Sequence, residues 1–288
     1  MFVFHQATFR ISVVWNGIVV LRPFKDEQSS IINKKMNILL TNDDGIFAPG
    51  LSAMYKELVK IGDVEVVAPA VSKSGASHSI TFNKPVVCNK VDVNGLFSGY
   101  SIEGSPADCV KLAAMQLCRH PIELLVAGIN NGANAGINVY YSGTVAAAME
   151  GVLLGIPSVA TSLAAEEKMD YDAAAGYCMH ILKKLMPVKP GALVNINIPL
   201  LSAGRPRGIK VVPQSNKAFD EYYEPQIDGK GQTVYQLAGG PGPFDDPLTD
   251  MMALMEGYIS VTALAPDVTD YDRTKQIRKS LAKLELPG

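Results

Sequence analysis

Short apolar runs alternate with segments of helical spacing from residue 38 to residue 198. The apolar runs are residues 38–40, 64–69, 123–127, 158–162 and 193–198. Helical spacing occurs between them, in residues 51–59, 108–117, 142–151 and 171–185. Short continuous apolar runs are typical of strands buried on both faces, and strands that alternate with helices form parallel sheets. The pattern therefore predicts an α/β fold, with helices on both faces of a mostly parallel sheet.

The pattern changes beyond residue 198. Strand candidates near residues 209–212, 233–236 and 258–262 are separated by segments rich in Gly, Pro and Asp, and a last helix is expected over 270–284. Long polar excursions of this kind tend to be functional loops or oligomer arms. We expect residues 36–288 to form a single domain with oligomerisation arms after about residue 200. Residues 1–35 are expected to be a leader outside the fold, and Met36 is a candidate for the true start.

Composition narrows the possible partners. A formal net charge of -2 and the lack of a Lys/Arg cluster give no support for binding to a nucleic-acid polymer or a membrane surface. No apolar run approaches the roughly 20 residues that span a bilayer. The four cysteines form no CxxC pair and match no zinc pattern, which indicates reduced thiols in a cytoplasmic protein.

Two adjacent carboxylates, Asp43 and Asp44, follow the first apolar run and precede a helix. In open α/β sheets, ligands bind at the carboxyl ends of the strands. Two neighbouring carboxylates repel unless a proton or a cation lies between them, and a hard cation such as Mg²⁺ prefers oxygen ligands. The pair therefore indicates a metal-dependent enzyme for an anionic substrate. An alternative is that Asn-Asp-Asp-Gly is only a turn, since these residues are also favoured in turns.

Two further loops carry similar chemistry. Ser74 and Gly75, in a loop rich in hydroxyl groups, could offer an oxygen and exposed N–H groups to a metal or a phosphate. His78 in the same loop is a candidate acid or base. Residues 128–136 contain three Asn and three Gly, among them Asn130 and Asn134. Asn supplies neutral oxygens and amide donors, and Gly lets the backbone approach a ligand closely. A solvated surface loop and a flexible turn are the plain alternatives.

The helix that begins at Ser142, Gly143 and Thr144 combines hydroxyl groups with free backbone N–H groups. Such a helix start can bind an anion, although ordinary capping by Ser or Thr gives the same pattern. The chain contains no GxxxxGK[ST], GxGxxG or GxSxG motif, which disfavours P-loop hydrolysis, a dinucleotide site and a serine hydrolase. Taken together, the loops predict one site at one edge of the sheet.

In the motifs around these loops, the chain resembles the SurE family of survival-protein phosphatases. The resemblance is carried by long motifs in order along the chain, from about residue 36 to residue 197. They are Thr-Asn-Asp-Asp-Gly-Ile at 41–46, Ser-Gly-Ala-Ser at 74–77, Gly-Ile-Asn-Asn-Gly-Ala-Asn at 128–134 and Tyr-Ser-Gly-Thr-Val-Ala-Ala-Ala-Met-Glu-Gly at 141–151. One position departs from the pattern, because Ala127 stands where many members have Ser.

The resemblance implies a Rossmann-like three-layer core with C-terminal hairpin and helix extensions, and a homodimer or homotetramer formed by exchange of C-terminal segments. It implies a phosphatase for nucleoside 5′- and 3′-monophosphates, and for short-chain polyphosphate in some members. One divalent metal ion per subunit, Mg or Mn, is expected. Carried over residue by residue, the implied metal ligands are Asp43, Asp44, Ser74 and Asn130.

Asp43 is also the expected catalytic residue, either by direct attack on phosphorus or by deprotonating a water. Asn134, Ser142, Gly143 and Thr144 are expected to hold the substrate phosphate. Two other functions remain open at this stage. One is a non-catalytic nucleotide- or metal-sensing module on the same fold, and the other is a metal-dependent hydrolase of a different bond. Only the phosphatase requires phosphate release from nucleoside monophosphates.

Overall fold

The computed structural model describes residues 35–191, 193–217, 220–240, 246, 248–282 and 284. The expectations for residues 1–34 therefore lie outside the described residues. Met36–Gly288 is one compact unit, and Met36 is the first residue of its first strand. Within the described residues, no helix is both long enough and apolar enough to span a bilayer.

A nine-stranded sheet forms the centre of the described part of the chain, in the order β3-β4-β2-β1-β5-β6-β7-β11-β8. The six strands from β4 to β7 in that order are all parallel to one another. Antiparallel pairing occurs only towards the edges, between β3 and β4 and between β7 and β11. The strands are β1 (Met36–Thr41), β2 (Gly62–Pro69), β3 (Cys88–Val93), β4 (Phe97–Ile102), β5 (Leu124–Asn131), β6 (Ser158–Leu163), β7 (Leu193–Ile198), β8 (Ile209–Val211) and β11 (Ile259–Leu264).

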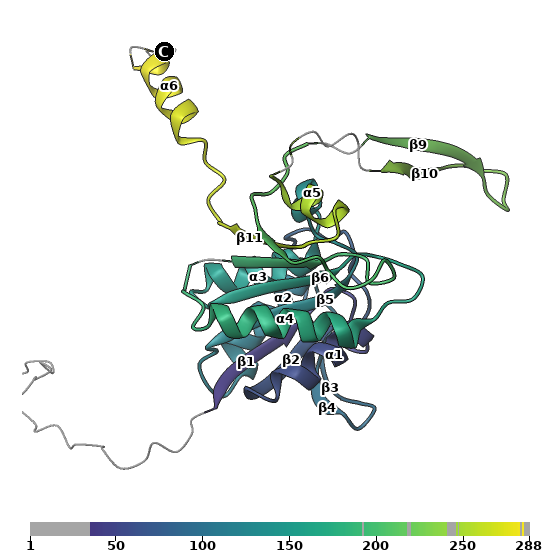
Figure 1. Cartoon of the computed structure of the whole chain (residues 1–288), viewed down its shortest axis with the longest axis vertical. Helices are drawn as coiled ribbons and strands as arrows, with labels where there is room; N and C mark the ends of the chain where they lie inside the picture. The colour runs from purple at the N-terminus through teal and green to yellow at the C-terminus, as the bar shows by residue number, and fades with distance from the viewer. Residues whose placement is uncertain are drawn as a thin grey trace, which may run out of the picture. The chain divides into compact units, whose positions relative to one another are not determined.

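Helices cover both faces of this sheet, which confirms the predicted α/β class. The helices are α1 (Pro49–Leu58), α2 (Pro106–Leu112) with a π-helical turn (Ala113–Leu117), a 3-10 helix (Gly136–Tyr140), α3 (Gly143–Leu153), α4 (Tyr171–Leu185), α5 (Asp250–Met255) and α6 (Tyr271–Leu281). In Figure 1, α4 lies in front of the strands and α3 lies behind them. Side chains of α1 and α4 belong to one core cluster, and those of α2 and α3 belong to the other.

The sequence of β1 lacks polar alternation because both faces of this strand are buried. Ile38 and Leu40 pack in the cluster of α1 and α4, whereas Leu39 packs in the cluster of α2 and α3. Successive side chains of a strand point to opposite faces, so a strand in the middle layer must be apolar at every position. Burial of each such side chain contributes about 1.5–3 kcal/mol.

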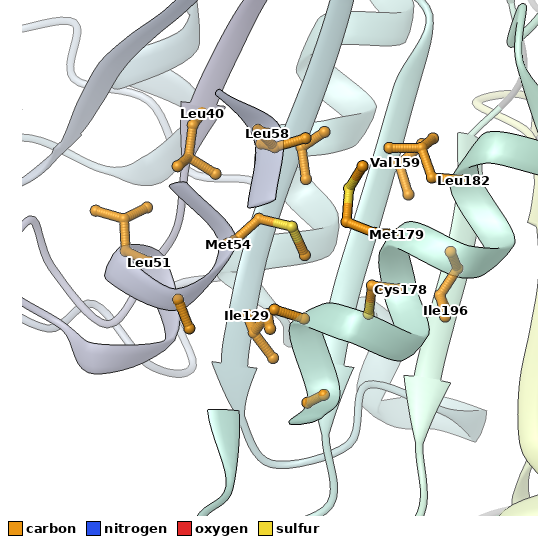
Figure 2. Packing of buried hydrophobic residues seen from close by; sticks show 14 of the residues in the cluster. Leu40, Leu51, Met54, Leu58, Ile129, Val159, Cys178, Met179, Leu182 and Ile196 are labelled. Atoms are coloured by element: carbon orange, nitrogen blue, oxygen red, sulfur yellow. The ribbon is translucent and has the colours of Figure 1, made fainter. Parts of the chain in front are cut away.

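The cluster of α1 and α4 follows from helical spacing. Leu51, Met54 and Leu58 are three and four residues apart, so they lie on the buried face of α1. Figure 2 shows them opposite Met179 and Leu182 of α4, above the strands. α1 thereby packs on β1 and β5, and α4 packs on β5, β6 and β7.

One expectation about the middle of the chain needs correction. The predicted loop at 128–136 begins later, because β5 continues to Asn131. After a register shift, Asn130 and Asn131 pair with Ser162 and Leu163 of β6. The Asn and Gly residues suggested a turn, but pairing with β6 extends β5 through Asn131.

The C-terminal part contains two elements that the sequence did not predict, namely β9 (Asp220–Ile227) and α5. β9 pairs in antiparallel fashion with β10 (Thr233–Gly240) in a separate two-stranded sheet. Every residue of β9 is exposed, and α6 has no buried residue. The predicted hairpin and helix extensions are therefore present. Their use in oligomerisation stays a prediction.

Candidate active site

The turn after β1 places Asp43 and Asp44 at the carboxyl edge of the sheet. Asn42 fixes this turn, because its amide donates to the carbonyl of Gly45 at 3.0 Å and accepts from the N–H of Gly45 at 3.2 Å. Gly45 has φ of 105°, a conformation that a side chain would strain. The carbonyl of Asp43 accepts a hydrogen bond from the N–H of Lys73 at 2.7 Å. This bond joins the turn to the loop of residues 72–79, called here the Ser74 loop.

Asp43 is nearly buried, at 3% exposure, against the start of α3. The hydroxyl of Thr144 donates to Oδ1 of Asp43, and the backbone N–H groups of Gly143 and Thr144 also donate to this carboxylate. Burial raises the pKa of Asp43 above its usual range, and these hydrogen bonds act in the opposite direction. A ligand cation would stabilise the ionised form further.

Asp44 is only partly buried and lies beside the end of β5. The N–H of Asn131 donates to Oδ2 of Asp44 at 3.0 Å. Burial raises the pKa of Asp44; the hydrogen bond from Asn131 lowers it and the charge of Asp43 raises it further. The charge of Asp43 thus disfavours ionisation of Asp44, which is one half of the mutual repulsion that the sequence suggested for an adjacent pair.

The Asn residues near the end of β5 are held by other polar groups. Asn130 is buried, and its amide donates to the carbonyl of Gly132 at 2.8 Å, which leaves its Oδ1 for a ligand. Asn134 donates one amide hydrogen to Oγ of Ser162 at 2.9 Å, and its second amide hydrogen remains for a ligand. Its backbone N–H donates to Oδ1 of Asn197 at 2.7 Å.

The Ser74 loop is tied to the region around the start of α3. Ser77 donates from its N–H to the carbonyl of Tyr141 at 3.1 Å and from its hydroxyl to the carbonyl of Tyr140 at 2.9 Å. Nε2 of His78 lies 2.8 Å from Oε2 of Glu150, a residue of α3. These contacts fix the loop and hold Ser74 at the edge of the site.

These elements enclose a pocket of about 190 Å³. Its lining residues are Asp43, Ser74, Gly75, Asn130, Asn131, Gly132, Ala133, Asn134, Asn138, Tyr141 and Ser142. The structure therefore brings together most of the residues that the sequence selected. Asp44, Gly143 and Thr144 do not line the pocket. Asp44 lies beside it, because it accepts a hydrogen bond from the N–H of the lining residue Asn131.

The position of Gly143 and Thr144 differs from the expectation that they face a phosphate. Their donors are directed at Asp43, because the carboxylate lies at the N-terminus of α3. At Ser142, the side chain caps the helix by accepting from the N–H of Val145 at 3.0 Å, while the residue also lines the pocket. Of these three residues, Ser142 is therefore the one that both caps α3 and lines the pocket, where it can contact a ligand.

Comparison with known proteins identifies the family. The family model described as Survival protein SurE matches residues 38–221. A protein of Desulfitobacterium hafniense (strain DSM 10664 / DCB-2), named 5′-nucleotidase SurE, is 45% identical over 254 residues, which cover 88% of this chain and 100% of the relative. The chain belongs to the SurE family.

Other SurE relatives agree with this assignment. A protein of Syntrophobacter fumaroxidans (strain DSM 10017 / MPOB), also named 5′-nucleotidase SurE, is 41% identical over 247 residues, covering 85% of this chain and 99% of the relative. The crystal structure of the SurE protein from Aquifex aeolicus matches with a TM-score of 0.73 and 39% identity, covering 85% of this chain and 99% of that chain. The resemblance inferred from the motifs and the Rossmann-like sheet are both confirmed.

The sequence did not indicate several residues that support this SurE site. Asn195 and Asn197 of β7 are fully buried, and both donate from their side chains to the carbonyl of Asn134, at 2.8 and 3.3 Å. A signal was present, because two Asn residues alternate with apolar residues in a strand that is otherwise buried. Unpaired burial of an amide is costly, so such a strand predicts a polar partner nearby.

Proposed function

We propose that this SurE protein is a divalent-metal-dependent phosphomonoesterase that releases phosphate from nucleoside 5′-monophosphates. The observation that carries the proposal is the convergence of Asp43, Ser74, Asn130 and Asn134 on one pocket, in a chain whose relatives are named 5′-nucleotidase. Action on nucleoside 3′-monophosphates and on short-chain polyphosphate extends the same proposal.

The donor set fits one hard divalent cation, Mg²⁺ or Mn²⁺. Within the described residues, no group of three or more His, Cys, Asp or Glu side chains could hold a metal ion. A site here must therefore combine the carboxylates of Asp43 and Asp44 with neutral oxygens, which Asn130 and Ser74 offer. The mixed oxygen set matches the preference of Mg²⁺. A cation held by these oxygens would polarise a phosphate oxygen and offset its charge.

The residues of the chain have separate roles in this proposal. Asn134 and Ser142 contact the phosphate oxygens, since both line the pocket with a polar side chain. Gly143 and Thr144 act indirectly by holding Asp43 through their donors. The buried network around Asn134 holds its backbone and its side-chain amide in place, so little ordering is needed when substrate binds.

Asp43 is the proposed catalytic group. It attacks phosphorus directly, or it removes a proton from the attacking water. Turnover in H₂¹⁸O separates these routes, because attack by Asp43 puts ¹⁸O into its carboxylate when the acyl phosphate is hydrolysed at the carboxyl carbon. If water instead attacks the acyl phosphate at phosphorus, the carboxylate gains no label. Phosphate trapped on the enzyme then identifies Asp43 as the nucleophile. A water nucleophile predicts neither label nor trapped phosphate on the protein.

The test of the function is phosphate release from 5′-AMP and 3′-AMP with Mg²⁺, with Mn²⁺ and with EDTA. We expect release that EDTA abolishes and that Asp43→Asn reduces by at least about 100-fold. Asp172→Asn is a matched control, because Asp172 is an exposed carboxylate of α4 that contacts only the surface residue Lys56 among the described ion pairs. Metal-loaded, folded protein that binds 5′-AMP but releases no phosphate would favour the sensing module instead.

We also propose that the C-terminal part forms a homodimer or homotetramer. Large apolar side chains are exposed on the β9/β10 sheet and on α6. They are Tyr222, Tyr223, Ile227, Val234, Tyr235, Leu237, Tyr271, Ile277 and Leu281. Light scattering on the full chain tests this, since Tyr235→Ser with Leu237→Ser should lower the molar mass. A monomeric wild type at micromolar concentration would reject the proposal.

A further inference from the structure

Tyr141 is the one aromatic residue among the described residues that line the pocket. Tyr141 is 56% exposed, so its ring lies at the rim of the pocket rather than inside it. The other lining residues are Asp, Asn, Ser, Gly and Ala. The rim at Tyr141 is therefore the place in this pocket where a flat apolar group finds a large apolar surface.

The backbone at Tyr141 is fixed from several sides. Its N–H donates to the carbonyl of Asn138 at 3.1 Å, and its carbonyl accepts from the N–H of Ser77 at 3.1 Å. The next residue, Ser142, caps α3. An exposed aromatic ring on a fixed backbone can receive a ligand with little loss of conformational entropy.

The neighbouring Tyr140 makes a close comparison. It is similarly exposed, at 62%, but it lines a different pocket, together with His78, Val145 and Met149. Ser77 bonds to the carbonyls of both tyrosines. The two residues thus share a backbone contact with Ser77 and differ in the pocket that they line.

The pocket is too small to enclose a base beside the phosphate, and its lining is mostly polar. Pockets that enclose a drug-sized ligand are usually about 300–1,000 Å³, and this one is about 190 Å³. If the phosphate lies against Asp43 and Asn134, the nucleoside must extend across the rim. Bases stack on aromatic rings with limited dependence on base identity, because every base has a flat face.

We infer that Tyr141 binds the nucleoside part of the substrate by stacking against its base. The inference rests on the proposed nucleotidase function and adds the residue that distinguishes a nucleotide from a simple sugar phosphate. Asp43 and the neighbouring polar groups recognise the phosphate, and Tyr141 recognises the base. Stacking through a ring predicts broad acceptance of purine nucleotides.

The experiment compares 5′-AMP with ribose 5-phosphate, which has the same ester but no base. For each variant of the full, metal-loaded chain, kcat/KM for 5′-AMP is divided by kcat/KM for ribose 5-phosphate. Tyr141→Ala should lower this ratio by about 10-fold through a higher KM for 5′-AMP. Tyr141→Phe keeps the ring and Tyr140→Ala is the matched control, so both should leave the ratio within about 2-fold of wild type.

Several results would overturn the inference. A wild-type ratio near 1 would mean that the base contributes nothing. A loss in Tyr141→Phe as large as that in Tyr141→Ala would assign the contact to the hydroxyl group, and an equal loss in Tyr140→Ala would assign it elsewhere. If wild type hydrolyses neither ester, the proposed phosphatase function is wrong, and the base contact of Tyr141 must be tested by binding instead. Calorimetric titration with 5′-AMP then decides, because Tyr141→Ala should still bind it about 10-fold more weakly.

Discussion

The hydroxyl of Thr144 donates a hydrogen bond to Oδ1 of Asp43, although the two residues are 101 positions apart in the chain. This contact joins the carboxyl end of β1 to the first turn of α3. It fixes one oxygen of the carboxylate at the start of the helix. A residue selected by sequence as a phosphate ligand thereby becomes a residue that positions the proposed catalytic group.

Thr144→Val should weaken catalysis without changing the volume of the core. Loss of a hydrogen bond to a charged group costs about 1.5–3 kcal/mol, so kcat for 5′-AMP should fall by about 10- to 100-fold. Thr144→Ser retains the hydroxyl and should stay within about 3-fold of wild type. The pH dependence of kcat should also shift in Thr144→Val, because its donor lowers the pKa of Asp43. Unchanged kinetics in the valine variant would remove Thr144 from this role.

Gly143→Ala should displace Asp43. An added Cβ would lie 2.8 Å from Cβ and 2.9 Å from Oδ2 of Asp43, closer than carbon atoms pack. We expect a loss of about 1–3 kcal/mol in the free energy of unfolding, with a clear loss of phosphate release. Gly176→Ala is the control, since nothing lies within 4 Å of its added Cβ in α4. That helix substitution should stabilise by roughly 0.5–1 kcal/mol, and equal effects of the two would contradict the steric argument.

Asp108 should contribute stability that depends on pH. It accepts from the N–H and hydroxyl of Thr81, at 2.9 and 2.6 Å, and from the N–H of Ser105 at 2.8 Å. Burial alone would raise its pKa, but these hydrogen bonds outweigh burial and lower it. The stabilisation is therefore complete above the unfolded pKa of about 3.9 and is lost as pH falls through the lower folded pKa.

Urea unfolding of Asp108→Asn and wild type at pH 7 and at pH 3 tests this sign. We expect the variant to be less stable by about 1–2 kcal/mol at pH 7. The difference should shrink at pH 3, where the wild-type carboxyl begins to bind a proton. The exposed Asp172→Asn serves as the control and should show little difference at either pH. A difference that grows as pH falls would contradict the assigned direction.

Glu150→Gln should loosen the Ser74 loop. The Glu150 side chain is 4% exposed and contacts both His78 and Lys111. Removing its charge leaves the ammonium of Lys111 without a carboxylate and weakens the hydrogen bond with His78, although the partial exposure of both partners reduces the cost to about 1–2 kcal/mol. Hydrogen exchange of the amides in residues 72–79 should become faster. A double-mutant cycle with His78→Asn should give a coupling of at least about 0.5 kcal/mol, and additive effects would show that the pair does not hold the loop.

The local sequence was enough for the strands and helices of the core. Ile38, Leu39 and Leu40 are apolar without alternation because both faces of β1 are covered, and that pattern is visible without a structure. The exposed β9 has no such pattern, since no face of it is buried. Its prediction failed because a strand is recognised in sequence through what it buries.

The sequence by itself determined which loops reach the carboxyl edge of the sheet, because the alternation of apolar runs with helical spacing is a local pattern. Tertiary structure decided what those residues contact. The extension of β5 through Asn130 required pairing with β6, and the support of Asn134 required two Asn residues of β7. Contacts between residues distant in the chain depend on how layers pack, and no local pattern in either segment specifies its partner.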